Sequence, residues 1–226
     1  MSRPILRSGL VLVALTLGVM GASRAGWQRV PVEVVVPPKI ETTAGERVLV
    51  TLTRADEHPL FNIGQEVTRW LRREISRSTA LEVLDVPPPQ IPEQRPEVLA
   101  VNDVFWKRLG EDFEADLIVA AIADYRIEDR SGFVTEDYVS DLTGQTVRRT
   151  VFRDRTGYLL RLQVFFLQGD NGALLHMDTW EEERVLEGED REDLHVLFRL
   201  LEMFSTDLQG VLVSTTVAEP RFIWVE

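Results

Sequence analysis

The chain has 226 residues, a formal net charge of −12 and no cysteine. This length is enough for one domain with a buried core, and the acidity excludes the basic surface on which nucleic-acid binding and adhesion to an anionic membrane depend. The absence of cysteine excludes disulfides and the acylated cysteine of a lipoprotein.

Residues 1–25 have the pattern of a secretory signal peptide. Arg3 and Arg7 precede an apolar stretch at residues 9–21, and small residues lead up to Ala25 as at a cleavage site. The apolar stretch is shorter than the roughly 20 residues that a helix needs to span a bilayer. We therefore expect an exported, periplasmic protein with no membrane span once the signal is removed; an uncleaved amino-terminal anchor is the alternative.

Residues 26–45 are expected to form an extended lead segment. Residues 32–36 have the composition of a short strand, which Pro37 and Pro38 end. Because proline cannot donate to a strand ladder, the segment is predicted to lie at an edge or to form an arm. A single α/β domain at residues 46–213 follows, and residues 214–226 form a tail that is expected to be accessory, like the lead segment.

Strands and helices alternate in the first half of the domain. The apolar patterns predict strand, helix, strand and helix, in that order, at residues 46–53, 63–75, 81–86 and 98–109. Asn62 is expected to cap the first helix, with Gln65 three residues on as in a capping box. The second helix is expected to end at Gly110 and to bury a stripe made of Val101, Val104, Phe105 and Leu109. Short strands alternating with helices imply parallel strands.

The stretch at residues 115–129 is predicted to be the central strand of the sheet. Residues 117–123 are an unbroken apolar run, which is typical of a strand buried on both faces. Residues 124–129 alternate and are polar, as in a strand that leaves the core. The rest of the domain is therefore expected to pack around this strand.

The second half of the domain predicts an antiparallel hairpin followed by a long helix. The pattern gives a strand, a turn, a partner strand and a helix at residues 158–168, 169–172, 173–185 and 190–213. The hairpin is expected at the edge of the sheet. The predicted fold class is thus α/β, with a mixed sheet (βαβαβ and then an antiparallel hairpin) packed by three main helices.

Residues 131–156 predict a β-hairpin insertion that protrudes from the sheet, with its tip at residues 142–145. Both of its faces are expected to be polar, so the hairpin gains little by packing on its own domain. A two-stranded ribbon alone is marginal in water. We therefore expect it to lie against a protein partner or a second copy; a solvated loop is the alternative. The candidate partner contacts are Phe133, Tyr138, Val147, Arg148, Arg149, Val151 and Phe152. Four arginines are expected to meet an acidic surface such as this protein's own: Arg148, Arg149, Arg153 and Arg155.

Few residues are suited to catalysis or metal binding. His58 follows the first strand beside Asp56 and Glu57, at a place where ligands and catalytic groups of α/β sheets often lie. The alternative is an exposed loop histidine that the acids solvate, and we favour it because no second histidine has metal-ligand spacing. His176 and His195 are expected to be structural.

An acidic run at residues 181–193 has oxygen ligands that suit calcium, but it lacks the spacing of an EF-hand. Acidic residues at a helix start are expected in any case. The sequence has no glycine-rich phosphate loop, nucleophile elbow or zinc-protease helix. We therefore predict no catalytic residue, no cofactor and no metal site.

Three stretches follow one another in a recognisable order. They are a short strand at residues 47–52, a helix followed by a Val-Leu strand at residues 64–84, and a Leu-Gly to Ala-Asp-Leu-Ile-Val segment at residues 109–122. Together they resemble the periplasmic α/β domain shared by the curli-secretion channel (CsgG-type), the TolB amino-terminal domain and the LpoB-type activators of penicillin-binding proteins. The resemblance implies a non-catalytic domain of envelope assembly or transport machinery. This chain departs from the family in having no cysteine to acylate and a polar insertion in place of membrane-crossing hairpins.

These observations predict a non-catalytic periplasmic interaction or scaffold module, an accessory subunit of a cell-envelope assembly or transport complex. The alternative is a periplasmic carrier of a small or lipidic ligand, held in a pocket between the sheet and a helix. An enzyme that uses Asp56, Glu57 and His58 is a third hypothesis.

Overall fold

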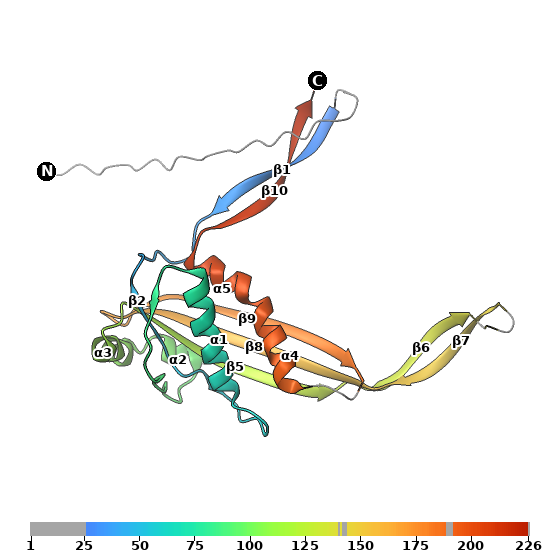
Figure 1. Ribbon diagram of the computed structural model, residues 1–226, viewed down its shortest axis with the longest axis horizontal. Helices are drawn as coiled ribbons and strands as arrows, with labels where there is room; N and C mark the ends of the chain where they lie inside the picture. Colours follow the sequence, from blue (N-terminus) through green and yellow to red (C-terminus); the bar gives the residue numbers. More distant parts are fainter. Residues whose placement is uncertain (1–25, 140, 142–143, 189–191, 226) are drawn as a thin grey trace. The chain divides into compact units, whose positions relative to one another are not determined.

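The computed structural model describes residues 26–139, 141, 144–188 and 192–225. The predicted signal peptide and part of the predicted hairpin tip lie outside these residues. The described chain divides into two units, a larger one at Pro38–Val213 and a smaller one made of the residues before Pro38 and after Val213 (Figure 1).

The larger unit is built on a mixed six-stranded sheet. Its strands are β2 (Arg47–Val50), β3 (Arg54–Ala55), β4 (Glu82–Val83), β5 (Leu117–Asp129), β8 (Arg155–Gln168) and β9 (Leu174–Glu187). The order across the sheet is β4-β2-β5-β8-β9, with β3 beside β5. Strands β2, β3 and β4 are parallel to their neighbours, whereas β8 and β9 are antiparallel. The predicted mixed α/β sheet is therefore confirmed.

Helices cover both faces of this sheet. On one face lie α1 (Ile63–Ser78), α4 (Asp193–Met203) and α5 (Ser205–Leu212), and on the other lie α2 (Pro96–Ala100) and α3 (Asp103–Phe113). Strand β5 contributes to both cores, because Val119 packs under α1 while Ile118 packs under α3, and both are fully buried. The prediction of a central strand buried on both faces is confirmed.

Helix α1 forms as its sequence predicts. The side chain of Asn62 accepts a hydrogen bond of 2.9 Å from the backbone N–H of Gln65, which satisfies one of the free donors at the helix start. Five apolar side chains at helical spacing are buried, namely Ile63, Val67, Trp70, Leu71 and Ile75. The amphipathic stripe at helical spacing is therefore enough to predict which face of α1 is buried.

The predicted helix at residues 98–109 is wrong in its continuity and in part of its buried face. The chain breaks at Asn102, whose side chain caps α3 by accepting a hydrogen bond from the N–H of Phe105 at 3.3 Å. The break changes the helical phase, so Val101 and Val104 are 71% and 83% exposed, while Trp106 is buried. The helix also continues past Gly110 and ends at the left-handed residue Glu114, with φ 49°.

The predicted last helix is also two helices. Helix α4 ends at Met203 and α5 begins at Ser205, and the buried side chain of Phe204 lies between them. The described residues thus contain five helices, rather than the three that the sequence indicated. Both errors have one cause: a continuous apolar period does not reveal a change of helix axis.

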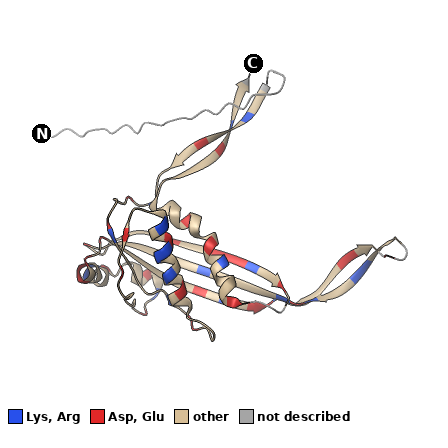
Figure 2. Cartoon of the chain, viewed as in Figure 1, with Lys and Arg blue, Asp and Glu red and all other residues tan. Residues whose placement is uncertain are grey.

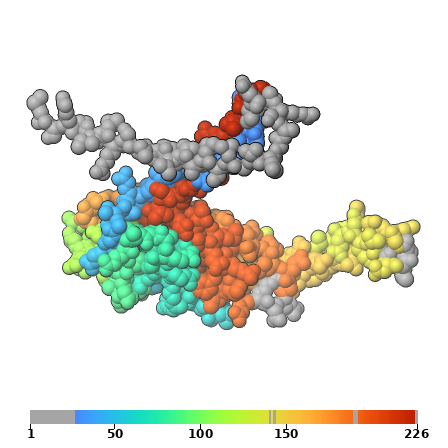
Figure 3. Space-filling view, turned by 45° about the horizontal axis from the view of Figure 1, so that its top comes forward, coloured from blue at the N-terminus to red at the C-terminus, as the bar shows by residue number. Residues whose placement is uncertain are grey.

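The protruding hairpin belongs to the larger unit and consists of β6 (Gly132–Val139) and β7 (Thr146–Arg153). The space-filling view shows it standing clear of the helices and the sheet of that unit (Figure 3). The predicted pair of hairpin strands is therefore confirmed, and its register is given below.

The smaller unit is a two-stranded antiparallel ribbon of β1 (Gly26–Val36) and β10 (Thr215–Val225). The strand predicted at residues 32–36 is longer than expected, because it begins at Gly26. The tail was expected to be accessory, and the structure shows that its residues Thr215–Val225 form a strand that pairs with the lead segment. Pairing partners so far apart in sequence leave no local signal.

Among the described residues, no helix has the length and apolar composition that crossing a membrane requires.

Two glycines in helices provide a matched test of the packing between α3 and β8. A Cβ at Gly110 would overlap the backbone carbonyl of Gly169, whereas a Cβ at Gly210 in α5 would meet open space. We expect Gly110→Ala to lower the free energy of unfolding by about 1–3 kcal/mol, because the backbone has to shift. Gly210→Ala is expected to raise it by about 0.5–1 kcal/mol through helix propensity alone. Urea unfolding measures both; an unchanged or more stable Gly110→Ala variant would contradict the close approach.

Candidate functional site

The β6–β7 hairpin continues the ladder formed by β5 and β8. The last pair of that ladder is Asp129 with Thr156, and the N–H of Arg130 then donates to the carbonyl of Arg155 at 2.8 Å. At the junction, the hydroxyl of Ser131 accepts a hydrogen bond of 3.1 Å from the N–H of Arg155. Pairing resumes between Gly132 and Arg153. The core strands therefore determine both the start and the register of the hairpin.

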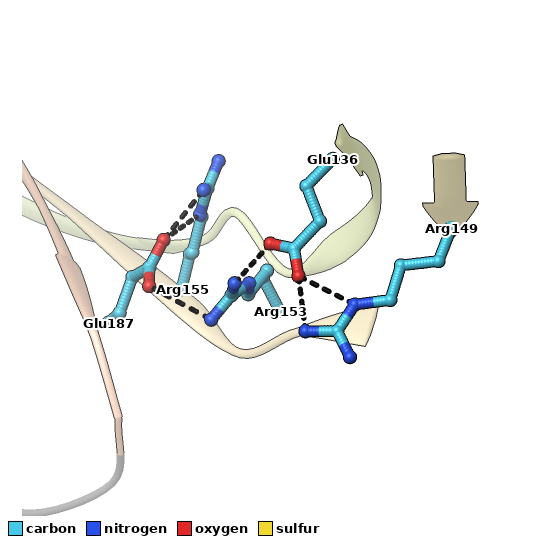
Figure 4. A network of polar contacts seen from close by, with 5 residues as sticks. All are labelled: Glu136, Arg149, Arg153, Arg155 and Glu187. Carbon is cyan, nitrogen blue, oxygen red and sulfur yellow. Dashed lines mark hydrogen bonds and ion pairs between the residues drawn. The ribbon is translucent and has the colours of Figure 1, made fainter. Parts of the chain in front are cut away.

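One face of the hairpin carries a network of charges around Glu136. Its carboxylate accepts hydrogen bonds from Arg149, at 2.6 and 2.9 Å, and from Arg153 (Figure 4). The two guanidinium groups, that of Arg153 first, hold the pKa of Glu136 below its ordinary value. Arg149 also lies over the ring of Tyr138, 4.8 Å from its centroid, in a cation–π contact.

The network extends from the hairpin to the edge strand β9. Arg153 lies 3.8 Å from Glu187, and the guanidinium of Arg155 donates to the same carboxylate at 2.6 Å and 2.8 Å (Figure 4). Arginines and acids thus alternate across the base of the hairpin. Exposed pairs of this kind add little stability one by one, but a network fixes the geometry of the strands that carry it.

The opposite face of the hairpin carries an exposed aromatic pair. Phe133 and Phe152 are directly opposite in register, with ring centroids 5.4 Å apart and planes at 72°. They are 79% and 59% exposed, and Val139 on the same face is 60% exposed. The expectation that both faces are polar is therefore wrong, because the register brings two phenylalanines together that lie far apart in the sequence.

The seven predicted contact residues divide between these two faces. The aromatic face has Phe133, Arg148 and Phe152, and the charged face has Tyr138, Val147, Arg149 and Val151. Arg148 donates to Asp137 at 3.1 Å across the strands. Figure 2 shows acidic residues on β6 beside basic residues on β7. The arginines expected to meet an acidic surface thus have acidic partners within their own chain. A role of any of these residues in partner binding stays a prediction.

Both outer edges of the hairpin lack a strand neighbour. In the part of the chain that the structure describes, β6 pairs with β7 alone and β7 pairs with β6 alone. Each outer edge therefore presents backbone N–H and C=O groups to solvent or to another chain. Sequence alternation predicted the two strands, and only the sheet order shows that nothing else in the described residues covers them.

His58 is not the exposed loop histidine that was favoured. Its side chain is 11% exposed, its ring lies 4.2 Å from that of Phe61, and its Nε2 is 3.7 Å from a carboxylate oxygen of Asp193. The hydroxyl of Tyr125 donates to the carbonyl of Asp193 at 2.9 Å, and burial, followed by the charge of Asp193, raises the pKa of Tyr125. The hydroxyl of Tyr158 donates to the carboxylate of Asp193 at 3.1 Å. These contacts tie the start of α4 to the sheet.

The other groups considered for chemistry lie apart. Asp56 and Glu57 are exposed, and neither side chain forms an observed hydrogen bond or ion pair with His58. His195 accepts a hydrogen bond from Arg199 at 3.1 Å, and His176 lies 3.5 Å from Asp178. Within the described ranges, no group of three or more histidine or acidic side chains is arranged to hold a metal ion.

A surface hollow of about 620 Å³ lies at the start of β2 and β5. Its lining includes the acids Glu46, Asp116 and Asp170 beside Leu117 and Leu175. An open, acid-lined hollow does not suit a lipid chain, and it is not the pocket between the sheet and a helix that the carrier hypothesis expects. The space between the sheet and its helices is filled by the two cores, so the carrier hypothesis gains no support from the hollow.

Comparison with known proteins identifies no family for this chain. No protein-family model matches the sequence, and no curated protein matches it. The resemblance to the CsgG-type, TolB and LpoB-type domains therefore stays a prediction.

Solved structures of several bacterial proteins have a partly similar chain path. A protein described as a neuraminyllactose-binding hemagglutinin homolog from Helicobacter pylori aligns with 75% of this chain and 89% of its own, at 9% identity and a TM-score of 0.43. A PelC dodecamer from Paraburkholderia phytofirmans aligns with 80% of this chain and 98% of its own, at 9% identity and a TM-score of 0.39. Lipoprotein GNA1162 from Neisseria meningitidis aligns with 72% of this chain and 97% of its own, at 12% identity and a TM-score of 0.39. These TM-scores are below 0.5, so they assign no function to this chain.

The Glu136 network predicts an acid-sensitive hairpin. Since the pKa of Glu136 is lowered in the folded state, its stabilising effect is present at neutral pH and is lost as the pH falls through that lowered pKa. Glu136→Gln should reproduce the loss at neutral pH, because a neutral amide cannot attract both arginines. Cross-strand nuclear Overhauser effects between β6 and β7 measure how far the two strands stay paired. Asp137→Asn, which removes a single arginine contact, is the control and should have the smaller effect; equal effects would contradict the central role of Glu136.

Proposed function

We propose that this chain is a non-catalytic interaction module of the bacterial cell envelope, an accessory subunit that docks a protein partner on the aromatic face of its β6–β7 hairpin. The observation that carries the proposal is the Phe133–Phe152 pair, two large apolar side chains that are 79% and 59% exposed on a ribbon with free edges.

The two rings contact each other across the strands, yet most of their surface stays exposed. The charged face already joins the two strands through Glu136 and its arginines, and the core of the larger unit lies elsewhere. Aromatic residues, phenylalanine among them, are enriched in the buried core of protein–protein interfaces relative to the rest of the surface. Each buries roughly 150–250 Å² when covered. A partner surface that covers both rings would therefore gain binding free energy from the burial of a large apolar area.

The free edges add a second mode of contact. A strand of the partner can pair with β6 or β7 through backbone hydrogen bonds while its side chains pack on the aromatic face. Because such pairing is independent of side-chain identity, the phenylalanines would supply the specificity. A second copy of this chain and another envelope protein both fit this description, and the size of the cross-linked product distinguishes them.

The envelope location rests on the sequence. Residues 1–25 have a signal-peptide pattern, the chain is acidic, and it has no cysteine. Export and periplasmic residence are part of the proposal. Detection of the chain in the cytoplasmic fraction with residues 1–25 intact would contradict them.

Site-specific photo-cross-linking in cells tests the docking face. A photoreactive residue at Thr150, on the aromatic face, should give one defined adduct with a protein partner. The same probe at Val147, on the charged face of the same strand, is the matched control and should give little. Adding F133A and F152A should abolish the Thr150 adduct, because each aromatic anchor is expected to contribute about 2 kcal/mol or more to binding. Equal adducts at both positions would refute a face-specific site.

Removal of the hairpin tests whether it serves binding or folding. Replacing residues 134–151 with a short Gly-Ser turn leaves β5, β8 and both cores unchanged. The melting temperature of the larger unit should therefore stay within a few degrees, while capture of the partner falls because most of both strands, with their free edges, is removed. Cooperative unfolding of the truncated chain at a much lower temperature would show that the hairpin belongs to the core.

A further inference from the structure

The two exposed tryptophans of the described chain lie together at one end of the smaller unit. The sequence has five tryptophans, and Trp70, Trp106 and Trp180 are buried in the larger unit. Trp27 and Trp224 are 70% and 54% exposed. They are opposite in the β1–β10 register, with ring centroids 5.6 Å apart and planes at 77°. Exposure of tryptophan is thus confined to one site on the ribbon.

The neighbours of this pair are apolar, basic or uncharged polar residues. Phe222 and Ile223 are 66% and 46% exposed, and they lie opposite Arg29 and Gln28. The alternation places Phe222 on the same face as the tryptophans and Ile223 on the other face. A two-stranded ribbon has no second layer, so it cannot bury these side chains by itself.

At this end of the ribbon, residues 26–31 pair with residues 220–225, and none of these paired residues is acidic. Its charges are those of Arg29 and Arg221. The acids Glu33 and Glu219 lie farther along the strands, and Glu219 accepts a hydrogen bond of 3.2 Å from Arg221. A surface rich in tryptophan, with arginines and without acids among its paired residues, has the composition found at the interface between lipid and water. We refer to Trp27, Phe222, Ile223 and Trp224 as the aromatic end.

The position of the aromatic end in the chain favours a lipid occupant. The apolar stretch at residues 9–21 is separated from the first residue of β1, Gly26, by residues 22–25 only. Export through a membrane therefore delivers this end of the ribbon next to a bilayer, whether or not the leader is later removed. Since the whole chain carries a net charge of −12, an anionic lipid surface would repel it, whereas a zwitterionic one would not.

We infer that the aromatic end binds the interface of a zwitterionic lipid bilayer, with the indole rings at the level of the head groups. This site is separate from the partner-docking face of the hairpin and goes beyond the proposed function. Binding depends on aromatic burial rather than on charge, so it should be insensitive to salt.

The test uses the protein in the form that exporting cells accumulate, with its amino terminus determined by mass spectrometry. Phosphatidylcholine vesicles should shift the tryptophan emission to shorter wavelength, and lipids brominated in the acyl chain should quench it. The three buried tryptophans supply a constant background. In Trp27→Phe, the remaining exposed Trp224 reports on the ribbon from a position remote in sequence from the leader, and it should still be quenched.

Paired variants determine whether the aromatic end is responsible. W27A/W224A should lower the vesicle partition coefficient at least about tenfold. The matched control is F133A/F152A, which removes the other exposed aromatic pair and should leave partitioning unchanged. W27F/W224F keeps an aromatic pair across the ribbon and should bind between wild type and W27A/W224A, which separates lost contact from a melted ribbon.

Three results would overturn the inference. They are absence of binding by the wild-type protein, equal loss in both alanine variants, and an unquenched Trp224. A change of oligomeric mass in W27A/W224A without any vesicle binding would assign the aromatic end to a second copy instead.

Discussion

The antiparallel pairing of β5 with β8 is the interaction on which the larger unit depends. It runs without a break from Leu117–Gln168 to Asp129–Thr156 and places apolar side chains alternately in the two cores. Its first part also pairs on the other side, with β2 at Leu117–Val119 and with β3 at Ile122 and Ala123, and this part lies under helices on both faces. The same ladder continues past the cores through Arg130 and Ser131, so the hairpin inherits its register from the two strands that form the middle of the sheet.

The chain carries two ribbons of similar construction and different chemistry. In each, an exposed aromatic pair lies across two antiparallel strands, Phe133–Phe152 on the hairpin and Trp27–Trp224 on the smaller unit. Two-stranded ribbons are marginal in water, so both depend on cross-strand contacts, and the Glu136 network supplies these on the hairpin. Neither ribbon buries its aromatic side chains within the described residues. This exposed apolar surface is a cost in the isolated chain that contact with another surface would remove.

The candidate site was partly predictable from the sequence. Alternation and a turn signal at residues 131–156 identified two strands, and the aromatic and basic residues on them were named as contacts. The division of these residues between faces was not predictable, because it follows from which residue of β6 lies opposite which residue of β7. A shift of one residue would have separated Phe133 from Phe152 and Glu136 from Arg149. His58 was misjudged for a related reason: its packing partners, Phe61 and Asp193, include one far away in the sequence.

What the sequence by itself determined is the local structure: the buried run of β5, the capped amphipathic helix α1, and the strands of the hairpin. In these elements, periodicity and capping act over a few residues, and tertiary packing agrees with them. Only the tertiary structure decided the breaks at Asn102 and Phe204 and the pairing of the lead segment with the tail. The pairing of the lead segment with the tail depends on residues distant in sequence, which no local pattern encodes. The cap at Asn102 is local, but only the packing of α3 on the sheet shows that the apolar stripe changes phase there.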